Sequence, residues 1–340
     1  MPELRQDLVT ERWVIIATER ARRPTEAVRE HVKNDDHSNC PFCNGHESQT
    51  PPEIWVARSS GGPNQPGWNV RVVANRFPAL RVEGQIDREG EGIYDRMNGI
   101  GAHEVIIETP NHTLELEDQP VEGIATILTA CKERMLDLLR DERLRYILMF
   151  KNVGRQAGAS LSHPHGQIIA TPITPSRVKR KLEGSRDYYR RKERSVFHDI
   201  LRQEQRDGRR TVYENGGFLS FCPYAARFPF ELCILPKRQA ADYHTITGEE
   251  INQLADVLKV TLKKLALALN RPQYNFILHT APARRARHRD YWDTLDQDFR
   301  WHIEILPRLT EPAGFEWGTG FYINPTPPEE SAQYLRELTI

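Results

Sequence analysis

Hydrophobic residues in the first half of the chain alternate between strand-like and helix-like spacing. Residues 103–110 have an apolar centre at 105–107 and end in a turn, which predicts a strand. Apolar side chains then recur every three or four positions and predict an amphipathic helix, at Val121, Ile124, Leu128, Cys131, Met135 and Leu138. Two further strands are predicted over 146–152 and 168–172, separated by a glycine-containing loop.

The second half of the chain repeats this order of elements. Strands are predicted over 230–236, 274–279 and 301–307. Between the first two of them lies a second helical pattern, with Ile251, Leu254, Leu258, Leu262, Leu265 and Leu269 on one face. The charged segment 179–210 is expected to contain a helix that connects the halves, and the first forty residues to form one strand and an extended polar wrap.

The imperfect repeat predicts a duplicated α+β module with antiparallel sheets and packed helices. A chain of 340 residues is long enough for two compact units. We expect residues 1–178 to form the first half and residues 179–340 the second.

Composition narrows the class of protein. The formal net charge is zero, which argues against a general nucleic-acid or membrane-surface binder. The chain has no run of 18 apolar residues, and its charged N-terminus lacks the apolar segment of a secretory signal. Five cysteines are an odd and small number for a disulfide framework. We therefore expect a cytoplasmic protein.

The run from His163 to Gln167 carries the clearest chemistry. A neutral imidazole can attack a phosphoryl group, and strand alternation would put His163, His165 and Gln167 on one face. Gln167 can donate to a phosphate oxygen, and Gly166 leaves room for a substrate. Only the first half has this motif. The alternatives are a surface accident or a plain metal pair, but a proline and a glycine inside a strand need a reason other than packing.

The residues around this run resemble the active-site signature of galactose-1-phosphate uridylyltransferases, a branch of the histidine-triad superfamily in which glutamine replaces the third histidine. The matching motif is Asn152-x-Gly154, then Gly158-x-Ser160, then His163-Pro164-His165-Gly166-Gln167. The resemblance continues in order through 20–24, 40–43, 75–80 and 229–231. It implies that each half is a histidine-triad-like module, the second one degenerate, and that the protein is a homodimer.

The resemblance also implies a reaction and a set of site residues. His165 would attack the α-phosphorus of a nucleotide sugar and release a sugar 1-phosphate, and a phosphate-bearing acceptor would then take the nucleotidyl group. Gln167 and Ser160 match the residues that hold the phosphate oxygens. The residues that match the nucleotide site are Arg20, Arg23, Phe42, Asn75, Phe77, Asn152 and Gly158, together with Ser160 and Gln167.

A single Cys-x-x-Cys motif, Cys40 and Cys43, suggests a metal site. Two imidazoles could complete a tetrahedral zinc site, and His163 and His112 match the family's ligand positions. Such a closed site, one zinc per chain, would be structural and would hold the strand that presents the nucleophile. His37 and His46 are nearby competitors for His112, and a metal-free cysteine pair is the alternative.

Members of the resembling family can carry a second metal site in the other half. His279, His302 and Glu304 fall at or near its ligand positions. Lys181 stands where a glutamate is expected, with Glu183 two residues on, so a second metal is not among our expectations.

The preferred interpretation is uridylyl transfer from UDP-glucose to a hexose 1-phosphate, galactose 1-phosphate above all. The tail from Gly314 to Pro325 does not match the hexose contacts of the best-known galactose enzymes and resembles the ending of ADP-glucose phosphorylase-like relatives. Adenylyl transfer from ADP-glucose to phosphate is therefore the alternative. Nucleotide hydrolysis is disfavoured because such hydrolases carry histidine at position 167, and a zinc-stabilised nucleotide sensor is disfavoured by the intact His165.

Overall fold

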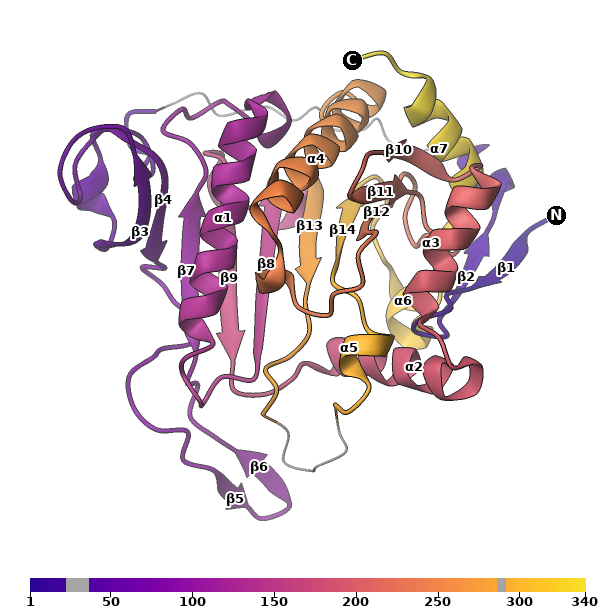
Figure 1. Cartoon of the computed structure of the whole chain (residues 1–340), viewed down its shortest axis with the longest axis horizontal. Helices are drawn as coiled ribbons and strands as arrows, with labels where there is room; N and C mark the ends of the chain where they lie inside the picture. Colours follow the sequence, from indigo (N-terminus) through magenta and orange to yellow (C-terminus); the bar gives the residue numbers. More distant parts are fainter. Residues whose placement is uncertain (23–36, 286–291) are drawn as a thin grey trace.

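A ten-stranded antiparallel sheet runs through the computed structural model, which describes residues 1–22, 37–285 and 292–340 (Figure 1). The strand order is β10-β11-β12-β14-β13-β8-β9-β7-β4-β3. Their bounds are β3 (Glu53–Arg58), β4 (Trp68–Ala74), β7 (Ala102–Ile107), β8 (Tyr146–Val153), β9 (His165–Thr171), β10 (Thr211–Glu214), β11 (Phe218–Phe221), β12 (Leu232–Pro236), β13 (Tyr274–His279) and β14 (His302–Pro307).

The sheet is built symmetrically about its central pair, β8 and β13. Outward from β8 the order is β9, β7, β4, β3, and outward from β13 it is β14, β12, β11, β10. A strand, a helix and two strands thus follow one another in each half, and the α+β class with an antiparallel sheet is confirmed. The boundary expected at residues 178 and 179 falls inside helix α2 (Ser176–Lys192), and this division stays a prediction.

One face of the sheet packs against α1 (Val121–Leu138) and α4 (Gly248–Leu269), which lie side by side (Figure 1). Their apolar sides form the main core with the inward residues of the strands, as the helical spacing predicted. Helix α4 begins with a capping box between Thr247 and Glu250 and ends at Asn270 in the left-handed conformation. Cys131 and Cys222 are buried in this core.

On the opposite face of the sheet, three described helices of the second half form a second core. Helix α2, α3 (Val196–Asp207) and the short α5 (Leu295–Asp298) contribute to this core, which also contains Phe221 and Leu235 of the sheet. The single connecting helix expected over 179–210 is therefore two helices. Helix α2 ends at Glu193, which adopts a left-handed φ of 55°.

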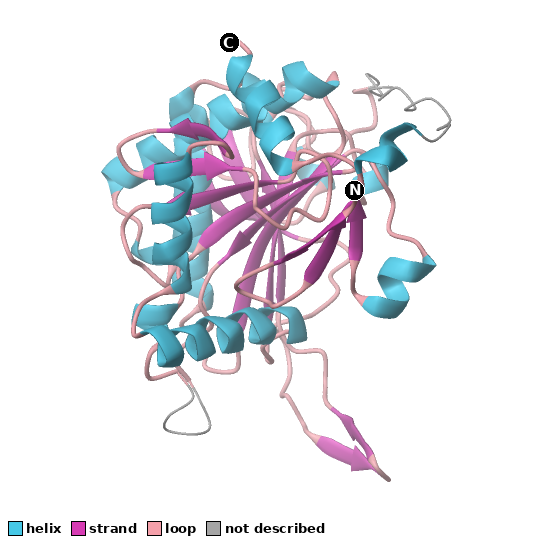
Figure 2. Ribbon diagram, turned by 90° about the vertical axis from the view of Figure 1, so that its right-hand side faces the viewer, coloured by secondary structure: helices cyan, strands magenta, loops and turns pink. Residues whose placement is uncertain are grey.

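Smaller elements border the main sheet. Strands β1 (Glu3–Gln6), β2 (Trp13–Ile16) and β15 (Tyr322–Asn324) form a three-stranded sheet, so the N-terminal segment supplies two strands instead of the expected one. The hairpin of β5 (Glu89–Glu91) and β6 (Tyr94–Arg96) projects from the body of the molecule (Figures 1 and 2).

The C-terminal segment adds α6 (Gly314–Thr319) and α7 (Pro328–Glu337). Leu335 and Ala332 of α7 are buried in the main core, so this helix completes the packing beside α4. Within the described residues, none of the helices has the length and apolar character that crossing a membrane requires.

Candidate active site

His165 is the first residue of β9 and lies on the sheet face opposite α1 and α4. Its Nδ1 atom lies 2.8 Å from the carbonyl oxygen of His163. Because that oxygen can only accept, Nδ1 carries the ring proton and Nε2 keeps its lone pair. Burial lowers the pKa of His165 to about 4, so the ring is neutral at physiological pH. A neutral imidazole with a free Nε2 lone pair is the form that acts as a nucleophile.

The structure corrects one detail of the motif. His163 precedes β9 and does not share a strand face with His165. Pro164 separates the two histidines and has no N–H to donate to the neighbouring strand. Its carbonyl oxygen accepts from the backbone N–H of Glu108. His163 is therefore free to turn toward the cysteines while His165 lies on the sheet.

A cavity of about 460 Å³ lies beside His165. Two candidates for the nucleotide site, Asn152 and the exposed Ser160, line it, together with Cys40, His112, Glu115, Lys151, Val153, Gly154, Arg155 and residues 159–164. Its loop is shaped by two left-handed glycines, Gly154 with φ 83° and Gly158 with φ 92°. A Cβ at Gly158 would lie 3.5 Å from Nδ2 of Asn152, which places this glycine against a cavity-lining side chain.

Gln167 is held by a histidine that the sequence analysis missed. The Nε2 atom of His103, on β7, lies 2.8 Å from Oε1 of Gln167, and Nδ1 of the same ring accepts from the backbone N–H of Ala79 at 3.1 Å. The ring proton is therefore on Nε2 and points at Oε1, which leaves the amide NH₂ of Gln167 available to a phosphate oxygen. The only sequence signal was a histidine at the start of a predicted strand, in phase with Val105 and Ile107.

A buried ion pair, which the sequence did not predict, lies beneath the segment that carries His165. Nζ of Lys151 lies 2.6 Å from Oε2 of Glu108, and both side chains are almost fully buried. A Cβ at Gly166 would lie 3.4 Å from Oε1 of Glu108, so the pair packs directly beneath the motif. Lys151 also contributes to the low pKa of His165, after burial. A lysine inside an otherwise apolar strand was the available signal.

The remaining nucleotide-site candidates lie in different surroundings. The ring of Phe42 packs edge-on against His165, with centroids 5.4 Å apart. Asn75 accepts from the backbone N–H of Phe77 at 2.9 Å, which ties these two candidates together near His103. Phe77 and Arg20 are exposed and are not among the residues that line the cavity. Arg23 lies outside the described residues.

The four expected metal ligands come together beside the cavity. One donor atom each of Cys40, Cys43, His112 and His163 lies within 4.8 Å of the others. Sγ of Cys43 is 3.3 Å from Nδ1 of His112 and 3.7 Å from Nδ1 of His163. The second ring nitrogen of each histidine, Nε2, faces away from the sulfurs. In His163 it lies 2.8 Å from the carbonyl oxygen of Thr109. This group could hold a metal ion, because both histidines aim Nδ1 at the sulfurs and the carbonyl oxygen of Thr109 fixes the tautomer of His163.

The structure also separates His112 from its competitors. Nδ1 of His46 lies 2.7 Å from the carbonyl oxygen of Cys40, so that ring supports the loop and does not point at the sulfurs. The ring of His37 packs edge-on against His112, with centroids 4.5 Å apart.

Comparison with known proteins identifies the family. The model of the N-terminal domain of galactose-1-phosphate uridyl transferase matches residues 1–175, which is slightly more than half of the chain. The chain belongs to this family. A domain model of unknown function also matches residues 120–338.

Relatives within the family cover the whole chain. An ADP-glucose phosphorylase of Arabidopsis thaliana is 36% identical over 343 residues, which span 100% of this chain and 93% of the relative. A galactose-1-phosphate uridylyltransferase of Thermotoga maritima is 30% identical over 348 residues, with 100% and 99% covered. The chain is thus an enzyme of the galactose-1-phosphate uridylyltransferase family and a nucleotidyltransferase.

Solved structures of family members have the same fold. The crystal structure of the ADP-glucose phosphorylase from Arabidopsis thaliana with bound ADP-glucose aligns with a TM-score of 0.85 at 34% identity, covering 100% of both chains. A uridylyltransferase structure aligns with a TM-score of 0.74 at 29% identity, covering 99% of this chain and 97% of the other.

Proposed function

We propose that this enzyme transfers a nucleotidyl group from a nucleotide sugar to a phosphate acceptor through a covalent intermediate on His165. The observation that carries the proposal is the bond between Nδ1 of His165 and the carbonyl oxygen of His163, which leaves a buried Nε2 lone pair beside the cavity. The function is the one expected from the motif, and family membership supports it.

The reaction proceeds in two steps at this atom. Nε2 attacks the α-phosphorus, the bond to the bridging oxygen breaks, and the sugar 1-phosphate leaves with the electron pair. An oxygen of the acceptor phosphate then attacks the same phosphorus, and Nε2 takes back its lone pair. Gln167 donates its amide N–H to a non-bridging oxygen during both steps, because charge increases there in the transition state.

We propose ADP-glucose as the donor and inorganic phosphate as the acceptor. This choice reverses the order of preference reached from the sequence. It is supported by the higher identity to the phosphorylase, 36% against 30%, and by the higher TM-score, 0.85 against 0.74. Uridylyl transfer from UDP-glucose to galactose 1-phosphate is the second candidate, favoured by the whole-length similarity to the Thermotoga enzyme.

The metal is proposed to be one structural zinc ion held by Cys40, Cys43, His112 and His163. Two sulfurs and two ring nitrogens form the donor set that zinc prefers, and burial suits a closed site. When bound, zinc would cross-link the loops around residues 40–43 and 112 to the segment before His165. The chain's own residues, not the metal, contact the reacting phosphate.

A labelling experiment tests the proposal. The protein is incubated with ADP-glucose or UDP-glucose carrying a labelled α-phosphate, and protein-bound label and sugar 1-phosphate are measured. We expect acid-labile, base-stable label with ADP-glucose, absent in His165→Asn and present in His198→Asn, whose exposed side chain lies on α3. Label in His165→Asn would refute the nucleophile. At least tenfold faster turnover of UDP-glucose with galactose 1-phosphate, about 1.4 kcal/mol, would establish the second candidate.

A further inference from the structure

The second half contains a cluster of side chains of the types that can bind metals, and the proposed nucleotidyl transfer does not use them. His279 on β13 and His302 and Glu304 on β14 each offer a donor atom, and these atoms lie within 4.8 Å of one another. Their residue types, two imidazoles and one carboxylate, are those that bind divalent transition metals. The question is what occupies the centre of this cluster.

Strand register shows that His302 and Glu304 are the counterparts of His165 and Gln167. At the centre of the sheet Phe150 pairs with Ile277. Gln167 lies opposite Phe150, and Glu304 lies opposite Ile277. His165 and His302 each precede these residues by two positions and begin their strands.

The two imidazoles are also held in the same way. Nδ1 of His302 lies 2.9 Å from the carbonyl oxygen of Arg300, two residues earlier, as Nδ1 of His165 lies 2.8 Å from that of His163. The Nε2 lone pair of His302 is therefore the equivalent of the nucleophilic lone pair.

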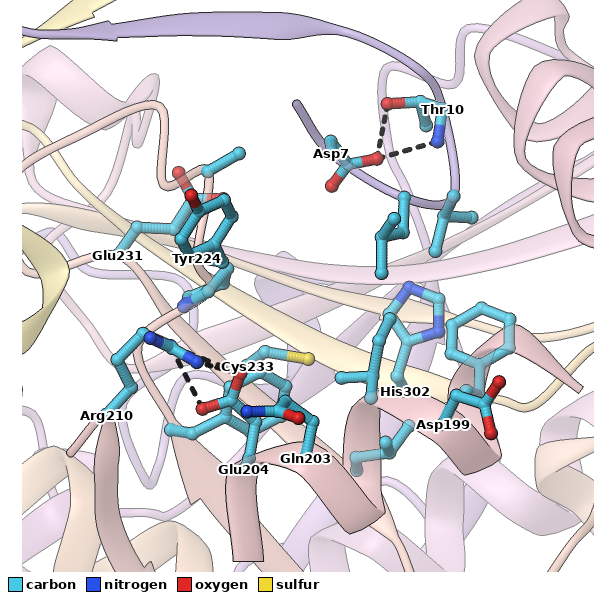
Figure 3. A pocket seen from close by; sticks show the side chains of 18 of the residues that line it. Asp7, Thr10, Asp199, Gln203, Glu204, Arg210, Tyr224, Glu231, Cys233 and His302 are labelled. Carbon is cyan, nitrogen blue, oxygen red and sulfur yellow. Dashed lines mark hydrogen bonds and ion pairs between the residues drawn. The ribbon is translucent and has the colours of Figure 1, made fainter. Parts of the chain in front are cut away.

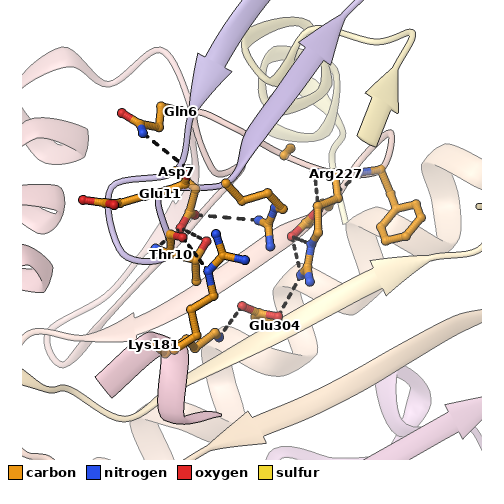
Figure 4. A network of polar contacts seen from close by, with 12 residues as sticks. Gln6, Asp7, Thr10, Glu11, Lys181, Arg227 and Glu304 are labelled. Carbon is orange, nitrogen blue, oxygen red and sulfur yellow. Dashed lines mark hydrogen bonds and ion pairs between the residues drawn. The ribbon is translucent and has the colours of Figure 1, made fainter. Parts of the chain in front are cut away.

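This lone pair is taken by Lys181, which reaches the cluster from α2. Its Nζ atom lies 2.9 Å from Nε2 of His302 and 2.6 Å from Oε1 of Glu304. The other carboxylate oxygen of Glu304 accepts from Nη2 of Arg227 at 2.7 Å, as Figure 4 shows. A metal ion at the centre would have to displace both contacts of the ammonium group.

The charges of the cluster are already balanced. Arg227 also binds Glu231, with Nη2 2.7 Å from Oε1, so two cations face two carboxylates. A divalent ion would leave two uncompensated positive charges among side chains that are mostly buried, and the desolvation of such charges is costly. Access does not prevent binding, because Lys181, His302 and Glu304 line a cavity of about 490 Å³ (Figure 3).

We propose that the ammonium group of Lys181 occupies the place of a metal ion in this cluster and keeps divalent cations out of the second half. The cluster then acts as a metal-free ion-pair anchor between α2 and β14. His302 cannot act as a second nucleophile, because Lys181 donates to the ring nitrogen that would attack.

Metal content of the intact protein tests the proposal directly. Wild-type protein and His302→Gln are incubated with excess Zn²⁺, dialysed, and analysed by inductively coupled plasma mass spectrometry. We expect both proteins to hold the same number of equivalents, since the cluster binds none. A wild-type protein with one more equivalent than His302→Gln would overturn the proposal. This comparison needs no variant at Lys181.

The complementary variant is Lys181→Glu. It lowers the charge of the cluster by two units, which a divalent ion would restore, and it adds a carboxylate ligand. We expect one additional zinc per chain, lost again when His302→Gln is added. Lys179→Glu, a half-exposed position on the same helix, is the matched control and should gain none.

Circular dichroism shows whether each variant is folded, and Lys181→Ala replaces Lys181→Glu if the latter is not. Lys181→Ala leaves three ligands and space for water, and we expect this variant to gain zinc as well. A folded variant at Lys181 without additional zinc would overturn the proposal.

Discussion

The Nε2 atom of His103 lies 2.8 Å from Oε1 of Gln167, and in the proposed mechanism this contact determines which end of the glutamine amide would face the reacting phosphate. Because Ala79 donates to the other ring nitrogen, His103 can act here only as a donor. The carbonyl end of Gln167 is therefore held on the protein side. In the proposed mechanism, His103 is therefore a positioning residue that acts through Gln167.

We expect His103→Leu to slow formation of the nucleotidyl intermediate by about 10²-fold, as the loss of an aligned donor typically does. The affinity for the nucleotide sugar should change much less, because the hydrogen bond from Gln167 acts mainly in the transition state. His103→Gln, whose amide nitrogen can still donate, should recover part of the rate. Single-turnover labelling with separate binding measurements checks this, and equal rates in His103→Leu and wild type would contradict it.

Removal of the proposed zinc ion should weaken the fold around His165. Without an ion, burial and the neighbouring Cys40 thiol raise the pKa of Cys43 to about 11, so the sulfur loses the thiolate form that a metal stabilises. We expect chelation of the wild type to lower Tm by about 5 °C or more. Differential scanning calorimetry should show that zinc restores it. Cys43→Ser should show the lower Tm from the start and no response to chelator.

The buried pair of Lys151 and Glu108 gives a stability prediction. Lys151→Met leaves a carboxyl group in a site where burial already raises the pKa of Glu108, and we expect a loss of about 3–5 kcal/mol in the free energy of unfolding. The double variant Lys151→Met, Glu108→Gln should be less destabilised than Lys151→Met alone. Urea unfolding of the wild type, Lys151→Met, Glu108→Gln and the double variant gives the coupling energy, and additive effects would show that the pair does not interact.

Gly154 tests the loop beside the cavity. Its φ of 83° disfavours other residues, and an added Cβ would lie 2.3 Å from Cγ of Gln273, whose Oε1 accepts from the backbone N–H of Gln156. We expect Gly154→Ala to cost about 1–3 kcal/mol of stability and to lower kcat/KM.

Gly208 offers a matched control for this loop. Its φ is 70°, and a Cβ there would meet nothing within 4 Å, so Gly208→Ala carries backbone strain alone. It should lose stability without losing activity. Equal loss of activity in both variants would show that strain, and not the loop, is responsible.

The sequence by itself determined the elements around the site. The apolar spacing predicted a helix over 121–138 and a strand over 274–279, and both ranges are confirmed because local periodicity reports which face of an element is buried. The candidate nucleophile His165 and the cysteine pair stood out for a different reason, because each lies in a short contiguous motif whose residue types restrict its chemistry.

Only the tertiary structure decided which distant residues complete these motifs. It selected His112 over His46 and His37, placed His103 on Gln167, and brought Lys181 between His302 and Glu304. These contacts join residues between 64 and 123 positions apart. They depend on strand register and on where a helix crosses the sheet, and local spacing does not encode either of these.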